Sequence, residues 1–494
     1  MVNFFITVYI NTHYWGCKMK QRFMGIVLVV SVLVVVSAAS VAEYYNRAPD
    51  VIPGTIPEMR SPSYWIALMK NPDEVILTQD NIQRMNADFR KKMLSDYLAK
   101  NVSPERKSAL MPYWPSMVST MPELHGLSPS AIADTVKKRI GDQIAYMRSR
   151  EFGDALGIVY PSWELDDLEK EMALDSVSER IAIRDGIAVR CARLRNSPSF
   201  FPEQIGLLDN AKTRWDLWNV GIIKIGKPVV ILHRSRSGEY MFVLCEVGYG
   251  WARCEDIAFA DKKVIDDFAD AKDFILCTGD RVQFYSDKSC EYASGFFRMG
   301  ECLPMADKNN PQIVKVLVRK TNGELTTETA WLAKDADVHV GWLTYTRRNI
   351  AETAFKLLDN RYDFTGAWFG RNHETLYRDI FACFGFNLPY HAGLFTHFGN
   401  DTMVLDPGVG REEQYKRILE KEPFMTLMIT LQDTGGHAQL LLGGYNGVPI
   451  VLDIHGYGYT DKDGKYVEVR RCVVGEITQP DYFLKRKLTF LVLK

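Results

Sequence analysis

Features that would point to nucleic-acid or zinc binding are scarce in this sequence. The 494-residue chain has a formal net charge of −1, and it has no dense basic run that could neutralise a phosphate backbone. Its nine cysteines include no C-x-x-C pair of the kind that holds structural zinc. The apolar run near the N-terminus is shorter than the roughly 20 residues that a membrane-spanning helix needs. A nucleic-acid partner is therefore not expected.

The composition is that of a folded globular protein. Hydrophobic residues make up 47% of the chain and charged residues 24%, a balance that allows burial of sizeable cores and argues against disorder. A chain of this length is too long for one core, so we expect three or four domains.

The N-terminus has the order of features typical of a secretory signal peptide. Three basic residues precede the apolar run 24–36, and small residues occupy 37–42. We expect a signal peptide over 1–42, with Met19 as the true start, and export to the periplasm or cell envelope. No cysteine follows the apolar run directly, which disfavours a lipoprotein anchor. An uncleaved signal anchor would be the only attachment to a membrane.

Export would allow cysteine pairs to oxidise. Cys245 and Cys254 flank the turn 248–250 in what we expect to be a β-hairpin, where they could face each other. Two small buried thiols are the alternative, and spacing alone does not decide between the two.

The first two thirds of the chain change from helical to strand patterns. Within 43–175, Thr78 is placed to cap a helix in which Ile82 and Met85 share a face. From 176 onward, short β-branched and aromatic segments alternate with Gly, Pro and Asn, as in small barrels. Strands are expected at 222–233 (as a pair), 240–244, 250–254, 280–285, 299–304 and 314–318.

The last part, 346–494, combines helices with a sheet. Thr346 is placed to cap one helix, and Gly385 is placed to end another. The apolar stripe of this second helix is formed by Leu376, Ile380 and Phe384. Strands are expected at 426–431, 437–442, 449–454 and 488–493. Helices followed by an antiparallel sheet indicate an α+β domain.

The segment from Tyr362 to Pro389 reads YDFTGAWFGRNHETLYRDIFACFGFNLP. It resembles the nucleophile segment of NlpC-type cell-wall peptidases, a papain-like family. Their pattern is Tyr-x-Trp-Gly-Gly, five residues, Asp-Cys-Ser, then a helix with Arg-Asp-Leu-Phe-x-x-Phe-Gly that ends in Leu-Pro. The matching residues are Tyr362, Gly366, Arg378, Asp379, Phe381, Phe384, Gly385, Leu388 and Pro389.

The nucleophile departs from this pattern. His373 stands where the family has its cysteine, Asn372 replaces the aspartate before it, and Glu374 replaces the serine after it. Such a peptidase needs a thiolate at a helix N-terminus, a base and an orienting group, and imidazole cannot form a stable acyl-enzyme. Cys383 is no substitute, because it lies ten residues on in the same helix, about 15 Å along its axis.

The base, in contrast, resembles that of the family. The stretch GHAQLLLG, which contains His437, is similar to the family's Gly-His-(Ile/Val)-Met-Leu-Tyr-x-Gly. Asp453 lies where the family has the third catalytic residue. His455, two positions on, would share its face of a strand. The resemblance thus implies His437, Asp453 and His455 as vestigial partners of position 373.

The strand-rich region resembles paired bacterial SH3 domains, through the order Gly-x-Pro-Val, Leu-His-x-Ser, Gly, Phe-Val, Gly-Trp. In this peptidase group such domains precede the catalytic domain and help to wall its substrate site. The implied domains are 43–175 (helical), 176–272 and 273–345 (SH3-like barrels) and 346–494 (papain-like). Trp215, Trp218 and Tyr240 are candidates for exposed aromatics in that wall; burial in the barrel core is the alternative.

The resemblance implies a multidomain α+β protein of the bacterial cell wall. Because the nucleophile is replaced, we expect a pseudoenzyme that binds peptidoglycan stem peptides of the L-Ala-γ-D-Glu type and needs no cofactor. Tyr362, Asn372 and Glu374 are its candidate substrate contacts.

Two alternatives stay open for the same site. One is an active peptidoglycan hydrolase like the γ-D-glutamyl-L-diamino acid endopeptidases of the family. The other is a metal site in which His373 and His437 converge with Asp453 or His455, since three nitrogen or oxygen ligands and a water form a catalytic zinc arrangement.

Overall fold

The computed structural model describes most of the chain after residue 49. The described residues are 50–98, 124, 127–149, 151–153, 158–199, 216–390, 392–398, 402–406, 408–432, 435–455, 458–460, 464, 466–477 and 486–494. The expected signal peptide and Trp215 lie outside them. The chain divides into two compact units, one of 50–459 with 469–494 and one of 1–49 with 460–468. No helix among the described residues combines the length and hydropathy needed to cross a membrane.

Helices form the first part of the described chain. They are η1 (Pro57–Arg60), α2 (Pro62–Leu68), α3 (Gln79–Leu98), α5 (Pro129–Arg148), α6 (Ser162–Glu171) and η4 (Leu174–Ser176). As predicted, Thr78 caps α3, and its hydroxyl accepts a hydrogen bond from the Asn81 amide at 3.3 Å. Along α5, Ile132, Val136 and Ile140 are buried in one core with the first sheet. The helix therefore packs by its apolar face.

The first sheet is antiparallel and has seven strands. They are β1 (Arg184–Ala188), β2 (Ala192–Arg195), β3 (Asn219–Ile223), β4 (Pro228–Arg234), β5 (Tyr240–Cys245), β6 (Gly248–Arg253) and β7 (Ile257–Phe259), in the order β3-β2-β6-β5-β4-β1-β7. The expected pairing within 222–233 is wrong, because β3 pairs with β2 and β4 with β1 and β5. The connecting turn bonds elsewhere: the amide of Gly226 donates to the carbonyl of Ala188, and the amide of Ala188 to that of Lys227.

The second sheet is also antiparallel and seven-stranded. After η5 (Cys254–Asp256) and α7 (Lys262–Ala269) it consists of β8 (Phe274–Cys277), β9 (Arg281–Tyr285), β10 (Ala293–Arg298), β11 (Cys302–Asp307), β12 (Asn310–Arg319), β13 (Leu325–Trp331) and β14 (Val338–Val340), in the order β10-β9-β13-β12-β11-β8-β14. The strand expected at 299–304 begins at Cys302 instead. Gly300 has a φ of +77° and belongs to the turn before that strand.

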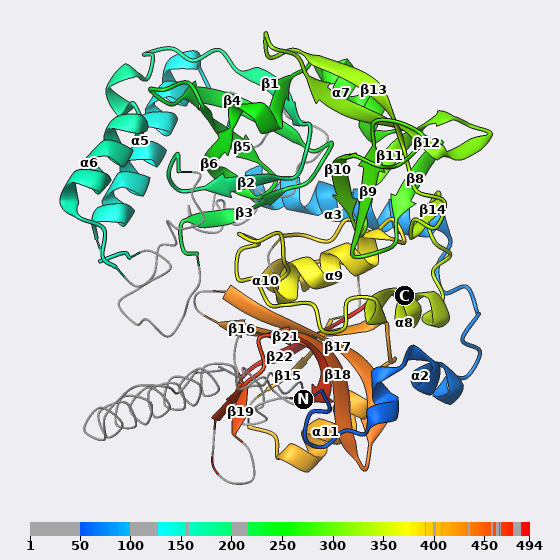
Figure 1. Ribbon diagram of the computed structural model, residues 1–494. Helices are drawn as coiled ribbons and strands as arrows, with labels where there is room; N and C mark the ends of the chain where they lie inside the picture. The colour runs from blue at the N-terminus through cyan, green and yellow to red at the C-terminus, as the bar shows by residue number, and fades with distance from the viewer. Residues whose placement is uncertain are drawn as a thin grey trace, which may run out of the picture. The chain divides into compact units, whose positions relative to one another are not determined.

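The C-terminal part is an α+β domain. Its helices are α8 (Arg347–Phe355), α9 (His373–Ala382), α10 (Ala392–Phe395) and α11 (Arg411–Leu419). Its antiparallel sheet has the order β15-β22-β16-β17-β18-β21, with β15 (Thr402–Leu405), β16 (Thr426–Gln432), β17 (Gly435–Tyr445), β18 (Val448–His455), β21 (Arg471–Glu476) and β22 (Leu488–Val492). Figure 1 shows α9 and α10 in yellow beside this orange and red sheet. Two short strands, β19 (Gly458–Thr460) and β20 (Tyr466–Glu468), are not part of it.

Both predicted helix boundaries in this domain are confirmed. The hydroxyl of Thr346 accepts a hydrogen bond from the Asn349 amide at 3.1 Å and caps α8. After α9, Gly385 adopts a φ of +87°, the left-handed conformation that lets the chain turn away from a helix end.

The two cysteines expected near a hairpin turn are free thiols. In the register of β5 and β6, Cys245 pairs with Gly248 beside the turn, whereas Arg253 pairs with Tyr240 at the other end. Cys254 follows Arg253, so the hairpin separates the two sulfur atoms by most of its length. The disulfide is therefore excluded, and each thiol instead contacts a backbone carbonyl.

Candidate functional site

His373 is the first residue of α9, as predicted, and Asn372 caps the helix. The side-chain oxygen of Asn372 accepts from the amides of Glu374 at 3.1 Å and Thr375 at 2.9 Å. The hydroxyl of Thr375 in turn accepts from the Asn372 amide at 3.0 Å, which completes a capping box. The positive end of the helix dipole therefore points to the position where a papain-like enzyme holds its thiolate.

The predicted base and its partner are in contact. The Nε2 atom of His437 lies 2.9 Å from Oδ1 and 3.1 Å from Oδ2 of Asp453. Gln439 donates from its side-chain amide to Oδ2 of Asp453 at 2.8 Å. The carboxylate is buried, with 1% of the residue exposed. Asp453 thus fixes the orientation of the His437 ring, the role that the third residue of a triad performs.

The ring of His437 faces His373. The centroids of the two imidazoles lie 4.5 Å apart, with 37° between their planes. Burial, and then the neighbouring His437, lowers the pKa of His373 to about 4. The ring is therefore neutral at physiological pH.

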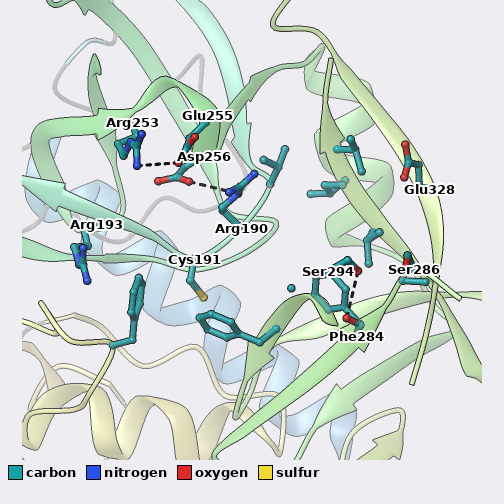
Figure 2. A pocket seen from close by; sticks show the side chains of 18 of the residues that line it. Arg190, Cys191, Arg193, Arg253, Glu255, Asp256, Phe284, Ser286, Ser294 and Glu328 are labelled. Atoms are coloured by element: carbon teal, nitrogen blue, oxygen red, sulfur yellow. Dashed lines mark hydrogen bonds and ion pairs between the residues drawn. The ribbon is translucent and has the colours of Figure 1, made fainter. Parts of the chain in front are cut away.

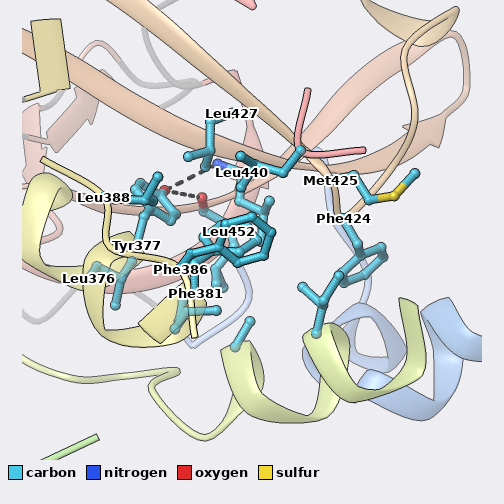
Figure 3. Packing of buried hydrophobic residues seen from close by; sticks show 14 of the residues in the cluster. Leu376, Tyr377, Phe381, Phe386, Leu388, Phe424, Met425, Leu427, Leu440 and Leu452 are labelled. Carbon is cyan, nitrogen blue, oxygen red and sulfur yellow. Dashed lines mark hydrogen bonds between the residues drawn. The ribbon is translucent and has the colours of Figure 1, made fainter. Parts of the chain in front are cut away.

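Tyr377, one helical turn after His373, ties the helix to the sheet. Its hydroxyl donates to the carbonyl of Leu452 on β18 at 2.7 Å and accepts from the amide of Leu440 on β17 at 3.1 Å. Figure 3 shows these two bonds within the apolar core beneath α9. Because His437 and Asp453 lie on the same two strands, this bridge sets the spacing between them and His373.

Glu374 turns its carboxylate back into the protein. Its Oε1 accepts from the amide of Ala392 at 2.9 Å, and its Oε2 lies 3.3 Å from the side-chain nitrogen of Asn372. The side-chain nitrogen of Asn372, Nδ2, also donates to the carbonyl of Phe364 at 3.0 Å. Tyr362 is partly buried against the core of the domain. Substrate contacts by Tyr362, Asn372 and Glu374 stay predictions.

The loop before α9 is held by the first sheet. The hydroxyl of Thr365 donates to the carbonyl of Asp216 at 3.1 Å, and the side-chain amide of Asn219 donates to the carbonyl of Thr365 at 2.7 Å. The carboxylate of Asp363 accepts from the amides of Trp368 at 2.7 Å and Gly370 at 3.0 Å. Thr365, which replaces a glycine of the family pattern, therefore anchors the loop.

The aromatic wall predicted from the first barrel is wrong for the residues that the structure describes. Trp218 is fully buried and packs between Phe152, at 5.5 Å between ring centroids, and Tyr160, at 5.1 Å. Tyr240 is 7% exposed and belongs to the same core. Aromatic rings carry much apolar area, and residues of α5 and of the segment between α5 and α6 share the core in which these two are buried. Trp215 lies outside the described residues.

The metal site predicted from His373, His437 and Asp453 is not formed. No group of three His, Cys, Asp or Glu side chains that could hold a metal occurs among the described residues. The Asp453 carboxylate instead binds His437 and Gln439. His455 ends β18, and its side chain is outside the described part, so its predicted role stays a prediction.

Neither Cys383 nor Cys472 offers a replacement nucleophile. Cys383 is fully buried, as predicted, and burial raises its pKa to about 12. Cys472 pairs with Ile454 across β18 and β21, close to the site. It too is fully buried, and burial followed by the charge of Asp453 raises the pKa of its thiol. Neither sulfur becomes a thiolate near neutral pH.

Two positioning residues were missed by the sequence analysis. Gln439 is two positions from His437 and therefore on the same face of β17, a signal that strand alternation carries. Tyr377 is four positions from His373 and shares its face of α9. In both cases the sequence spacing shows which face the residue shares, but it does not show the hydrogen-bond partner on the neighbouring strand.

The geometry defines a helix-and-sheet domain in which His437 is hydrogen-bonded to Asp453 and faces His373 at the start of α9. Residues 207–253 match the family model "SH3 domain (SH3b1 type)". The chain is similar in fold to an NlpC/P60 endopeptidase from Photobacterium damselae subsp. piscicida, with a TM-score of 0.65 and 16% identity over 90% of this chain and 99% of that one. The prediction of an NlpC-type fold with an SH3 domain is confirmed.

Weaker matches add no argument. The structures of NlpC2 and NlpC1 from Trichomonas vaginalis match with TM-scores of 0.20 and 0.21 and identities of 11% and 10%. Each match covers 60% of this chain, and 96% and 90% of those chains respectively. No curated protein matches the sequence. A second SH3 domain stays a prediction.

Proposed function

We propose that this chain is an exported cell-wall protein that binds peptidoglycan stem peptides at the His373 site without cleaving them. One observation supports this above all: His437 and Asp453 are assembled as a base and its orienting group, yet the ring of His437 faces an imidazole at 4.5 Å and not a thiol. The N-terminal pattern of the sequence supports export. The similar fold of an endopeptidase and the match to an SH3b1-type domain support the cell wall as the site of action.

The chemistry of position 373 favours binding over hydrolysis. An acyl group on imidazole is labile, so His373 gives no stable covalent intermediate of the kind that splits the peptidase reaction into two easier steps. The loop and the helix are nevertheless held in place, in particular by Asn372, Thr375 and Tyr377. Such a site keeps its shape while lacking its reactive atom.

Calorimetry of the purified chain with a defined stem peptide tests the binding. We expect saturable binding of L-Ala-γ-D-Glu-containing peptides with a free amino terminus, and weaker binding of the same peptides after N-acetylation. An absence of binding to any stem peptide would contradict the proposal. A peptide of the same length with only α-linkages serves as the control ligand.

A further inference from the structure

A cavity of about 610 Å³ lies between the first and second sheets, apart from the His373 site. Its volume falls within the roughly 300–1,000 Å³ of small-molecule and peptide sites. Figure 2 shows Arg193 and Asp256 of the first sheet region on one side, and Ser286 and Ser294 of the second on the other. Neither His373 nor His437 lines it.

Arg193 is one of the cations that line this cavity. Its Nε atom donates to the carbonyl of Ala367 at 2.6 Å, and its guanidinium lies 4.9 Å from the centre of the Phe369 ring. It forms no ion pair with any described residue, although it is half-buried. Burial, and then the nearby charge of Arg195, lowers the pKa of Arg193, and the opposing charges of Asp216, Asp363 and Asp256 do not fully offset this, so a bound anion would stabilise the guanidinium further.

Most other charged groups of the wall are paired, and the exception is Glu328, which is exposed and forms no ion pair with a described residue. Asp256 lies 3.5 Å from Nε of Arg190, and Glu255 lies 3.0 Å from a guanidinium nitrogen of Arg253. Arg195 is paired with Asp216 at 2.6 Å. Arg193 is therefore the arginine of this wall that forms no ion pair with a described residue, and it is the group best placed to meet a ligand anion.

A free strand edge runs along the same cavity. β10 is the last strand of the second sheet, and in the described part of the chain it pairs only with β9. Its residues Ser294, Gly295 and Phe296 line the cavity. Unpaired backbone groups at a sheet edge accept an extended peptide as an additional strand.

The strand edge and the cation meet at one aromatic residue. The ring of Phe369 lies 5.8 Å from that of Phe296 on β10 and 4.9 Å from the guanidinium of Arg193. An extended chain that follows β10 toward Phe296 would therefore reach Arg193 with its end. A peptide carboxylate suits the planar fork of a guanidinium better than a single point charge would.

We propose that this cavity binds the carboxylate end of an extended peptide, with Arg193 as its counter-ion and the edge of β10 as its backbone partner. The site lies apart from His373, so it stands whether or not that site binds stem peptides. It would give the chain a second point of attachment to a peptide.

Calorimetry with N-acetyl-trialanine, its C-terminal amide and inorganic phosphate tests the proposal on the full chain. We expect the free acid to bind, and the amide to bind at least about tenfold more weakly, the effect of one lost charge-assisted hydrogen bond. Arg193→Gln should weaken binding of the acid to the same extent, whereas Arg193→Lys should weaken it less, because lysine keeps the charge but loses the planar fork. Arg180→Gln, at an exposed arginine elsewhere, is the matched control.

Three results with the peptides would overturn the proposal. They are equal binding of acid and amide, unchanged binding in the Arg193→Gln variant, and no binding of the free acid at millimolar concentration. Phosphate that binds as tightly as the peptide and displaces it would also do so, because the site would then recognise any oxyanion. If Arg193→Gln fails to fold in a thermal melt, the acid–amide comparison on the unaltered chain and the Arg193→Lys variant still decide.

Discussion

At the scale of single residues, His373 links the chemistry of the site to the stability of the fold. Its pKa falls from 6.5 to about 4, because burial and the adjacent His437 disfavour the imidazolium. The folded chain therefore binds fewer protons at this position than the unfolded chain between these two pH values. The contribution of the neutral ring is fully present above pH 6.5 and is lost as the pH falls toward 4.

Replacing His373 by asparagine should flatten the acid side of the stability curve. We expect the melting temperature of the unaltered chain to fall more steeply between pH 6.5 and pH 4 than that of His373→Asn. In the free energy of unfolding, the difference should be at most about 3 kcal/mol for a pKa shift of this size. Thermal melts across this pH range measure it. His339→Asn, at an exposed histidine of β14, is the control. Parallel curves for the His373 variant and the unaltered chain would contradict the assignment.

Glu374 allows a simple test of whether a charge of the protein attracts the amino group of a ligand. Its carboxylate is the negative group next to position 373, and its residue is 8% exposed. Glu374→Gln keeps an oxygen for the Ala392 amide and removes the charge, so a stem peptide with a free amine should bind about tenfold more weakly. The N-acetylated peptide should be unaffected. Glu412→Gln, in the exposed first turn of α11, is the control, and an equal loss for both peptides would refute a role for the charge.

At the scale of elements, the position of α9 depends on one hydroxyl. Tyr377→Phe keeps the ring in the core and removes both hydrogen bonds to Leu440 and Leu452. Because two buried backbone groups then lose a partner, we expect a loss of about 2–4 kcal/mol in the free energy of unfolding. Denaturant titration measures it. Tyr64→Phe, at a partly buried tyrosine of α2, is the control, and a loss below about 0.5 kcal/mol would show that α9 is held by apolar packing alone.

The elements that the sequence predicted correctly are those with local signals. Thr346 and Gly385 mark the ends of their helices through their own backbone chemistry, and both boundaries are confirmed. The pairing of β3 with β2 was missed, because Gly226 gives the turn but not the strand that each arm joins. The sequence left Trp218 open between an exposed wall and a buried core, because its covering residues Phe152 and Tyr160 lie more than 50 positions away in the sequence. Contacts between residues far apart in the chain cannot be predicted from the local pattern of a single sequence.

At the scale of the whole molecule, one buried carboxylate joins three parts of the chain. Asp379 of α9 pairs with Lys224 beside the first sheet and with Arg371 at 2.7 Å, while Arg371 also pairs with Asp280 beside the second sheet. Burial would raise the pKa of Asp379, but the cations Lys224, Arg371 and Arg298 outweigh it and hold the pKa well below its usual range. Both sheets are thereby fixed to the helix that carries His373.

Asp379→Asn should therefore destabilise the assembly more than any exposed charge change. The substitution leaves Lys224 and Arg371 buried without their shared anion, and breaking such a pair costs about 3–5 kcal/mol. Chemical denaturation measures the loss, with Asp267→Asn on the exposed side of α7 as the control. Equal stability of the two variants would show that the parts are held together by apolar contacts.

The central claim is that the site binds a cell-wall peptide and has lost the atom that would cut it. Mass spectrometry of a defined muropeptide, incubated with the purified chain and separately with its His437→Ala variant, tests this most directly. The account predicts intact muropeptide in both samples, while calorimetry under the same conditions registers binding. Cleavage by the unaltered chain that disappears in the His437→Ala variant would contradict it, because the base would then serve a working nucleophile.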